Sequence, residues 1–173
     1  MTLTEEKALK KRNNHKAGRS PISTQKYYIS QIKADIDNIK RIINDALAYF
    51  DRSYSRMDEG TRYELKVIIN ELLVNAVKHG RKAGAACNVR VVAGLSAEDC
   101  AFLIVEDDGD GYDVARMNRF RGAGAAAGNI ESVEETGRGI YIVKSLCEDF
   151  MVNEKGNKVV VNKRLRRAGA NAM

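Results

Sequence analysis

One segment constrains the fold of this chain more than any other: a long apolar stretch that carries three regularly spaced polar residues. Its apolar residues recur at helical spacing, which predicts a helix from Asp58 to about Lys78. Glu71, Asn75 and Lys78 lie at positions i, i+4 and i+7, so they share one stripe of that helix. Burying such a stripe without a partner costs free energy, and a metal-bound nucleotide phosphate would satisfy all three groups. A solvated face on an amphipathic helix is the alternative interpretation.

A first glycine-containing turn follows an apolar strand that ends at Asp107. Gly109 and Gly111 come next, in the pattern Asp-x-Gly-x-Gly. Glycine adopts left-handed backbone angles and lets other groups approach the chain closely. Taken by itself, Asp107 fits an ordinary turn-forming role.

A second such turn, Gly137-Arg138-Gly139, precedes a helix predicted from Ile140 to Cys147. The free backbone N–H groups at the start of a helix attract anions. This turn is therefore a candidate phosphate site.

The polar helix and the two turns occur in an order that resembles the GHKL ATPase superfamily, which includes histidine kinases, type II topoisomerases, ninety-kilodalton heat-shock chaperones and mismatch-repair ATPases. Within it, the chain is most similar to the small anti-sigma factor serine kinases of bacterial partner-switching systems. The similarity covers roughly Tyr27 to Leu165. It implies an α+β fold, a two-layer α/β sandwich with helices on one face of a mixed, mostly antiparallel sheet. The periodicity itself indicates only the α+β content.

The resemblance implies a role for each matching residue. Asn75 corresponds to the magnesium ligand, and Glu71 to the general base that accepts the proton of the attacking hydroxyl. Asp107 corresponds to the carboxylate that binds the adenine amino group, which favours ATP over GTP. The other residues assigned to nucleotide contacts are Lys78, Gly109, Gly111, Gly137, Arg138 and Gly139.

Two further segments bear on this site. A long segment without periodicity, Tyr112–Thr136, corresponds to the family's ATP lid, and its candidate phosphate-binding cations are Arg116, Arg119 and Arg121. Many relatives carry a threonine after the glycine of the last hairpin, near the adenine. Here Asn157 and Lys158 occupy those positions, so adenine contacts are expected to be weaker or differently made.

The remaining elements follow from periodicity and turn residues. Gln25–Lys33 alternates like an edge strand, and Asp35 is the expected N-cap of a helix that ends near residues 52–55. The strands of two hairpins are predicted at residues 88–95 and 100–107, and at residues 150–153 and 159–165.

Composition predicts one folded domain with polar ends. The net charge of +6 is concentrated at the termini: residues 1–26 carry +5, residues 154–173 carry +5, and the body carries −4. We expect a basic flexible tail at 1–24, an ATPase/kinase domain at 25–166 and a C-terminal tail at 167–173. No apolar run reaches bilayer length and no signal peptide is evident, so a cytoplasmic protein without membrane or nucleic-acid binding is expected. The three isolated cysteines are expected to be reduced.

Three functions are compatible with these features. The favoured one is an ATP- and Mg²⁺-dependent protein serine/threonine kinase that binds a sigma factor, phosphorylates a STAS-type anti-anti-sigma protein and forms a homodimer, as the resemblance implies. A nucleotide-binding interaction switch without kinase activity would not require a general base at Glu71. A stand-alone ATPase domain of a two-component-like system needs a phospho-accepting histidine, and neither His15 nor His79 is suitably placed.

Overall fold

All the strands in the described part of the structure join one antiparallel sheet. In this computed structural model the described residues are 27–54, 57–80, 87–96, 99–111 and 135–169. The elements are, in chain order, β1 (Tyr28–Lys33), α2 (Ile36–Ser53), α3 (Glu59–Gly80), β2 (Asn88–Ser96), β3 (Cys100–Asp107), α5 (Glu135–Leu146), β4 (Asp149–Val152) and β5 (Lys158–Arg164). The strand order is β1-β2-β3-β5-β4, and each neighbouring pair is antiparallel.

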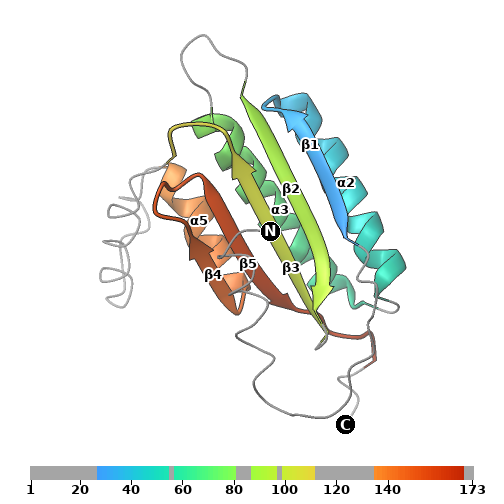
Figure 1. The fold of residues 1–173 in the computed structure, drawn as a ribbon. Coiled ribbons are helices and arrows are strands. Elements are labelled where there is room, and N and C mark those ends of the chain that lie inside the picture. Colours follow the sequence, from blue (N-terminus) through green and yellow to red (C-terminus); the bar gives the residue numbers. More distant parts are fainter. Residues whose placement is uncertain (1–26, 55–56, 81–86, 97–98, 112–134, 170–173) are drawn as a thin grey trace, which may run out of the picture.

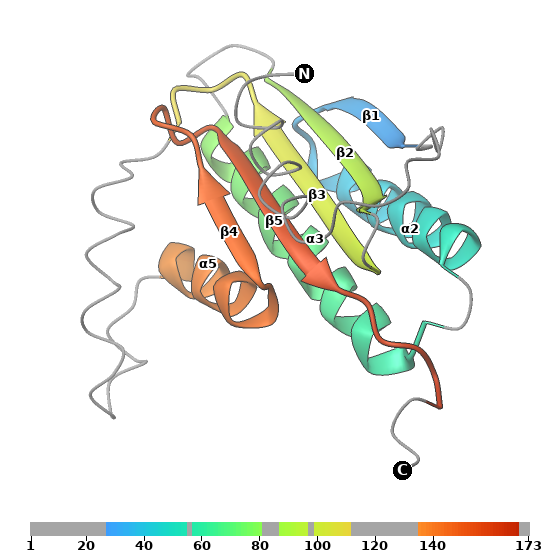
Figure 2. The same ribbon diagram turned by 60° about the horizontal axis from the view of Figure 1, so that its bottom comes forward.

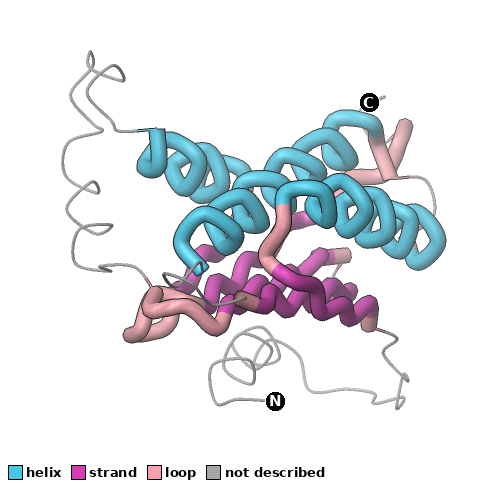
Figure 3. The backbone as a smooth tube through the Cα atoms, turned by 90° about the horizontal axis from the view of Figure 1, so that it is seen from above, coloured by secondary structure: helices cyan, strands magenta, loops and turns pink. Residues whose placement is uncertain are grey.

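The three described helices cover one face of this sheet, as the predicted two-layer sandwich requires (Figure 3). α2 lies behind β1 and β2, α3 behind β2 and β3, and α5 behind β4 and β5 (Figures 1 and 2). β1 lies at the edge of the sheet, as predicted. Both predicted hairpins are present: β2 pairs with β3, and β4 pairs with β5.

α2 begins and ends where its sequence predicts. The Asp35 carboxylate accepts a hydrogen bond from the backbone N–H of Asp37 at 3.2 Å, which satisfies one of the free donors of the first turn. The helix ends at Ser53, and the N–H of Tyr54 donates to the carbonyl of Phe50 at 2.8 Å. Ile36 is 67% exposed, because it is the first residue of the helix and lies beyond the core.

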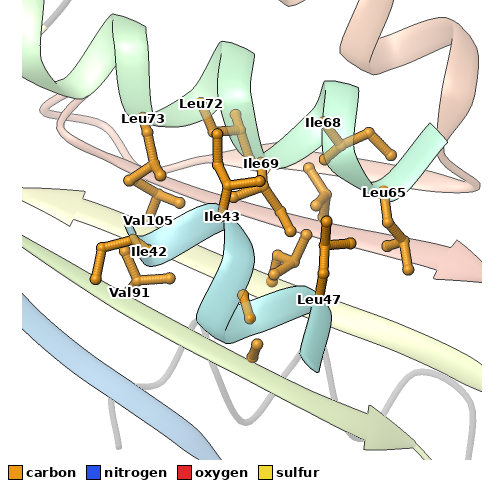
Figure 4. Packing of buried hydrophobic residues seen from close by; sticks show 14 of the residues in the cluster. Ile42, Ile43, Leu47, Leu65, Ile68, Ile69, Leu72, Leu73, Val91 and Val105 are labelled. Atoms are coloured by element: carbon orange, nitrogen blue, oxygen red, sulfur yellow. The ribbon is translucent and has the colours of Figure 1, made fainter. Parts of the chain in front are cut away.

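The main core lies between the helices and the sheet. Leu65, Ile68 and Leu73 of α3 are completely buried and point toward α2 and the strands (Figure 4). On the sheet, alternate residues such as Val91 and Val105 face these helices. Each such side chain contributes about 1.5–3 kcal/mol by leaving water, so this layer fixes the position of α3.

The helix after the second glycine turn begins earlier than predicted. α5 starts at Glu135, so Gly137 and Gly139 lie inside its first two turns rather than before it. Glycine is a poor helix former, which is why the sequence places the boundary at Ile140. Contact with α3 overrides that preference, as described below. Thr136, the last residue of the predicted lid, is therefore helical; residues 112–134 of the lid lie outside the described residues.

Other expectations fall partly outside the described residues. The basic tail at 1–24 lies outside them, whereas Arg167 of the predicted C-terminal tail forms an isolated β-bridge with Met57. Cys87, Cys100 and Cys147 are free thiols, as predicted. Within the described ranges, no helix is both long and apolar enough to cross a bilayer.

A cluster of charges joins the segment after β5 to the first turns of α3. The Lys163 ammonium lies 2.6 Å from the Glu64 carboxylate, and the Arg166 guanidinium lies 2.8 Å from the same group. The Lys163 side chain is only 10% exposed, and Glu64 is the carboxylate that faces its ammonium group. Burial raises the pKa of Glu64, but its partners Lys163 and Arg166 outweigh burial and hold that pKa below its ordinary value.

Replacing Glu64 should therefore destabilise the fold in a pH-dependent way. Since its pKa is lower in the folded than in the unfolded chain, its stabilisation is present above the ordinary pKa of 4.5 and is lost as the pH falls through the folded-state pKa. Glu64→Gln should lower the free energy of unfolding by about 1–3 kcal/mol at pH 7, and by less in acid. Chemical denaturation at several pH values measures this difference.

Asp51→Asn is the matched control for Glu64→Gln. It removes an ion pair with Arg62 in which both side chains are well exposed. Exposed pairs contribute about 0–1 kcal/mol. Equal losses for the two variants would contradict a structural role for the Glu64 cluster.

Candidate functional site

A pocket opens where α3, α5 and the loops at the ends of β3 and β4 meet. The space between its lining residues is about 330 Å³ when the adjoining open solvent is included, and most of it is not enclosed. Its walls combine apolar side chains with a few polar groups: Leu72, Asn75, Ala76, Val105, Asp107, Ile140, Val152, Gly156, Asn157 and Val159. A mostly apolar pocket with few polar groups is typical of a site for a flat heterocycle or another small molecule.

Asn75 brings a polar amide into this pocket from α3. The residue is 6% exposed, and its Nδ2 has no hydrogen-bond partner within the described residues. An unsatisfied buried donor costs about 1–3 kcal/mol, which a ligand in the pocket would recover. The acceptor of this side chain is its oxygen, Oδ1. A neutral oxygen of this kind is a suitable ligand for Mg²⁺. Asn75 thus fits the predicted role in metal-nucleotide binding.

Asp107 brings a carboxylate into the pocket from the end of β3. It is 5% exposed, and its Oδ1 accepts a hydrogen bond from the Gly109 N–H at 2.9 Å. Burial raises the pKa of this carboxyl above its ordinary value, although the Gly109 hydrogen bond opposes that shift. The turn-forming role and the binding role are compatible, because one oxygen serves the turn while the residue lines the pocket.

The neighbouring carboxylate, Asp108, has a different environment. It accepts hydrogen bonds from the backbone N–H and the side-chain amide of Asn88, at 2.8 and 2.9 Å. The side-chain hydrogen bond with Cys87, followed by those from Asn88, holds the pKa of Asp108 below its ordinary value. Asp108 thus joins two segments of backbone, whereas Asp107 lines the pocket.

The polar stripe of α3 lies directly against α5. A Cβ atom at Gly139 would overlap Oε2 of Glu71 and would lie 3.7 Å from Nδ2 of Asn75. Glu71 is partly buried and accepts a hydrogen bond from the Asn70 amide at 3.2 Å. Among the described residues, Glu71 forms no ion pair with Lys66 or Lys78. The fold therefore brings the polar stripe of α3 into contact with the Gly137-Arg138-Gly139 segment.

The other residues predicted to contact nucleotide differ in how exposed they are. Lys78 is exposed in the last turn of α3, and Arg138 is exposed on α5. Gly137 belongs to the first turn of α5. Gly111 has a positive φ of 81°, and a Cβ there would overlap the Lys155 carbonyl oxygen. Only glycine fits this approach of the β3 turn to the β4–β5 turn.

Asn157 is a pocket residue that the sequence did not identify as part of the site. It lines the pocket, and its side-chain amide donates a hydrogen bond of 2.5 Å to the backbone carbonyl of Asp107. The sequence marked this position as a departure from the family's threonine, but it gave no indication of a bond to Asp107. That bond joins residues fifty positions apart, and only the pairing of β3 with β5 brings them together.

Comparison with known proteins places this arrangement in a family. The family model described as "Histidine kinase-like ATPase domain" matches residues 32–163, which include α2, α3, α5 and most of the sheet. The chain belongs to the histidine kinase-like ATPase domain family. The match contains Glu71, Asn75, Asp107 and Gly139, the residues that surround the pocket and the α3–α5 contact.

The curated relatives of this histidine kinase-like ATPase domain include proteins named Serine-protein kinase RsbW. The one from Bacillus licheniformis is 30% identical over 105 residues, which cover 60% of this chain and 65% of the relative. The one from Staphylococcus epidermidis is 23% identical over 138 residues, covering 80% and 86%. The chain thus spans slightly less than two thirds of the first of these relatives. The structure of the Mycobacterial sensor histidine kinase MprB aligns over 80% of this chain with a TM-score of 0.43 and 18% identity.

A substitution at Gly139 tests the contact between α3 and α5. Alanine is normally better than glycine inside a helix by about 1 kcal/mol. Here its Cβ would meet the end of the flexible Glu71 side chain, which must turn aside, so Gly139→Ala should lose the gain of about 1 kcal/mol that alanine normally brings inside a helix. Adding Glu71→Ala removes the obstructing atoms, and the double variant should recover most of that gain. Chemical denaturation of the two single variants and the double variant gives the coupling, and additive effects would contradict the contact.

Proposed function

We propose that this chain is an ATP-dependent protein serine/threonine kinase that uses Mg²⁺. The observation that carries the proposal is the pocket itself. It holds a buried carboxylate, Asp107, and a buried amide with an unpartnered donor, Asn75. Glu71 lies one helical turn before Asn75, against Gly139 of α5. Base recognition, metal binding and a general base are thus available within one site.

The pocket supplies the binding part of the proposal. Asp107 accepts a hydrogen bond from the amino group of adenine, while Leu72 and Ile140 contribute apolar surface to the base. The Asn75 oxygen holds Mg²⁺, and the phosphates complete its coordination. Lys78, Arg138 and the N–H groups at the start of α5 neutralise phosphate charge. Within the described residues no group of three or more His, Cys, Asp or Glu side chains could hold a metal by itself, which agrees with such shared coordination.

Glu71 supplies the chemical part. ATP, when bound with Mg²⁺, provides a γ-phosphoryl group whose bond to ADP breaks as a new bond to the substrate oxygen forms. The Glu71 carboxylate accepts the proton that the serine or threonine hydroxyl loses. A purely binding protein has no need of a carboxylate at this position.

The proposed partners follow from the names of the relatives and from the family resemblance. Relatives named Serine-protein kinase support a protein substrate with a serine hydroxyl. By the family resemblance, that substrate is a STAS-type anti-anti-sigma protein, the regulated partner is a sigma factor, and the active form is a homodimer. Capture of partners from cell extract with ATP or with ADP, followed by transfer of labelled phosphate to each captured protein, tests this assignment. Captured partners that bind but never receive phosphate would favour the interaction switch.

Base selectivity should depend on Asp107. Calorimetry with Mg²⁺ should show micromolar binding of ADP, about −8 kcal/mol, and much weaker binding of GDP. In Asp107→Asn, Oδ1 still accepts from Gly109, so an N–H donor replaces the acceptor that faces the base. The Kd for ADP should then rise about tenfold or more, because a hydrogen bond to a charged group contributes about 1.5–3 kcal/mol.

Asp108→Asn is the matched control for this experiment, because it changes the adjacent carboxylate, which contacts Asn88 instead of the pocket. Its ADP affinity should be nearly that of the wild type. Equal losses of affinity in the two variants, or equal wild-type affinity for ADP and GDP, would contradict the adenine assignment.

The raised pKa of Asp107 predicts how binding depends on pH. The ionised carboxylate accepts the hydrogen bond from adenine, so binding favours the ionised form and its protonation opposes binding. Because the pKa in the free protein lies above the ordinary 3.8, ADP affinity should begin to fall at a higher pH than for an ordinary aspartate. For Asp107→Asn this component of the pH dependence should be absent. Calorimetry from pH 7 downward measures both curves, and identical curves would contradict the prediction.

Glu71→Ala should separate binding from chemistry. Glu71 does not line the base pocket, so the Kd for ADP should change less than threefold, while phosphate transfer to a captured partner should fall at least 100-fold. Asn75→Ala should impair both, since it removes the proposed metal ligand. Normal transfer by Glu71→Ala would show that this residue acts only in the packing of α5.

A further inference from the structure

The turn between β4 and β5 is held by a network of asparagine side chains. Oδ1 of Asn153 accepts hydrogen bonds from the backbone N–H groups of Asn157 and Lys158, at 3.1 and 3.0 Å. Nδ2 of Asn153 donates to Oδ1 of Asn157 at 2.9 Å. Gly156, with a positive φ of 77°, donates its N–H to the Asn153 carbonyl at 3.0 Å. This network fixes both the backbone and the amide plane of Asn157.

Asn157 in turn forms two hydrogen bonds with the backbone of Asp107. Its side-chain amide donates to the Asp107 carbonyl at 2.5 Å, and its own carbonyl accepts from the Asp107 N–H at 2.9 Å. The backbone donor and acceptor of Asp107 are therefore both bonded to one residue. The Asp107 side chain is left with the Gly109 N–H as its hydrogen-bond donor within the described residues.

The polar groups of the Asn157 side chain are thus engaged before any ligand arrives. Its oxygen accepts from Asn153, and its amide nitrogen donates to Asp107. Asn157 lines the pocket, and these bonds fix the plane of its amide, although each uses only one of its two N–H donors and one of its two acceptor lone pairs. Asp107 remains the residue that distinguishes an amino group from a carbonyl on a purine.

We propose that Asn157 is a positioning residue for base selectivity: by clamping the backbone of Asp107, it holds the Asp107 carboxylate in the orientation that selects a 6-amino purine. This inference deepens the proposed function and rests on it. Two properties support it: the clamp is half-buried beside the pocket, and rotation of the Asp107 peptide group would break its hydrogen bonds to Asn157. Loss of the clamp should affect which purine is bound more than it affects the fold.

The test compares ADP with inosine diphosphate, which has a carbonyl in place of the 6-amino group. Binding of both to the full chain is measured by calorimetry with Mg²⁺, and folding by thermal unfolding. In Asn157→Ala the Kd for ADP should rise about tenfold, which is one net hydrogen bond of about 1.4 kcal/mol. The Kd for inosine diphosphate should change little, so the selectivity between the two falls by a similar factor.

A double-mutant cycle shows whether Asn157 acts through Asp107. In the Asp107→Asn background the carboxylate is already lost, so adding Asn157→Ala should raise the Kd for ADP less than threefold. The same factor in both backgrounds would overturn the inference. Asn157→Asp removes the amide donor at nearly constant size, so it provides the same comparison if Asn157→Ala does not fold.

Two controls separate this effect from general loss of structure. Asn153→Ala removes the bonds that fix the Asn157 amide but leaves that amide able to donate to Asp107, so it should lower selectivity by less than Asn157→Ala does. Asn162→Ala changes a buried asparagine of β5 that bonds to Asp149 and does not line the pocket, so it should not change selectivity. If all three asparagine variants lower selectivity equally, the clamp has no specific role.

The outcomes also separate this inference from the function on which it rests. Wild-type protein that binds neither ADP nor ATP would overturn both. Wild-type protein that selects ADP over inosine diphosphate, with Asn157→Ala retaining that selectivity, would overturn the positioning role alone.

Discussion

The packing of α3 is the constraint on which the rest of the structure depends. One side of this helix buries Leu65, Ile68 and Leu73 against α2 and the sheet. That burial fixes the rotation of α3 about its axis, and the rotation determines where its polar residues point. Asn75 consequently lies in the wall of the pocket, with Glu71 one turn away against α5.

Close packing at this boundary requires a residue without a side chain. α5 approaches the polar stripe of α3 at Gly139, where any Cβ would meet the Glu71 carboxylate. Glycine inside a helix costs about 1 kcal/mol relative to alanine, so the position gives up intrinsic helix stability. What it gains is close contact between α5 and the Glu71 side chain of α3.

At the end of β3, the position of each acidic side chain is set by the strand and by its hydrogen-bond or ion-pair partner. Alternation along β3 directs Asp107 toward the helices, and Glu106 toward the other face, where it pairs with Lys158 at 3.1 Å. Next in sequence, Asp108 bonds to Asn88. Three consecutive acidic residues therefore have three different partners. Burial raises the pKa of Asp107, whereas hydrogen bonds lower the pKa of Asp108.

The sequence by itself determined the elements and the family. Hydrophobic periodicity located α2, α3 and both hairpins, because burial on one face imposes a period of 3.6 or 2 on the chain. Residue chemistry identified Glu71, Asn75 and Asp107 as candidates, since buried polar groups need partners. Only the tertiary structure decided three further points: that α5 begins at Glu135, that Gly139 meets Glu71, and that Asn157 clamps Asp107. These contacts join residues far apart in the chain, so they depend on how packed surfaces meet, which no local pattern in the sequence records.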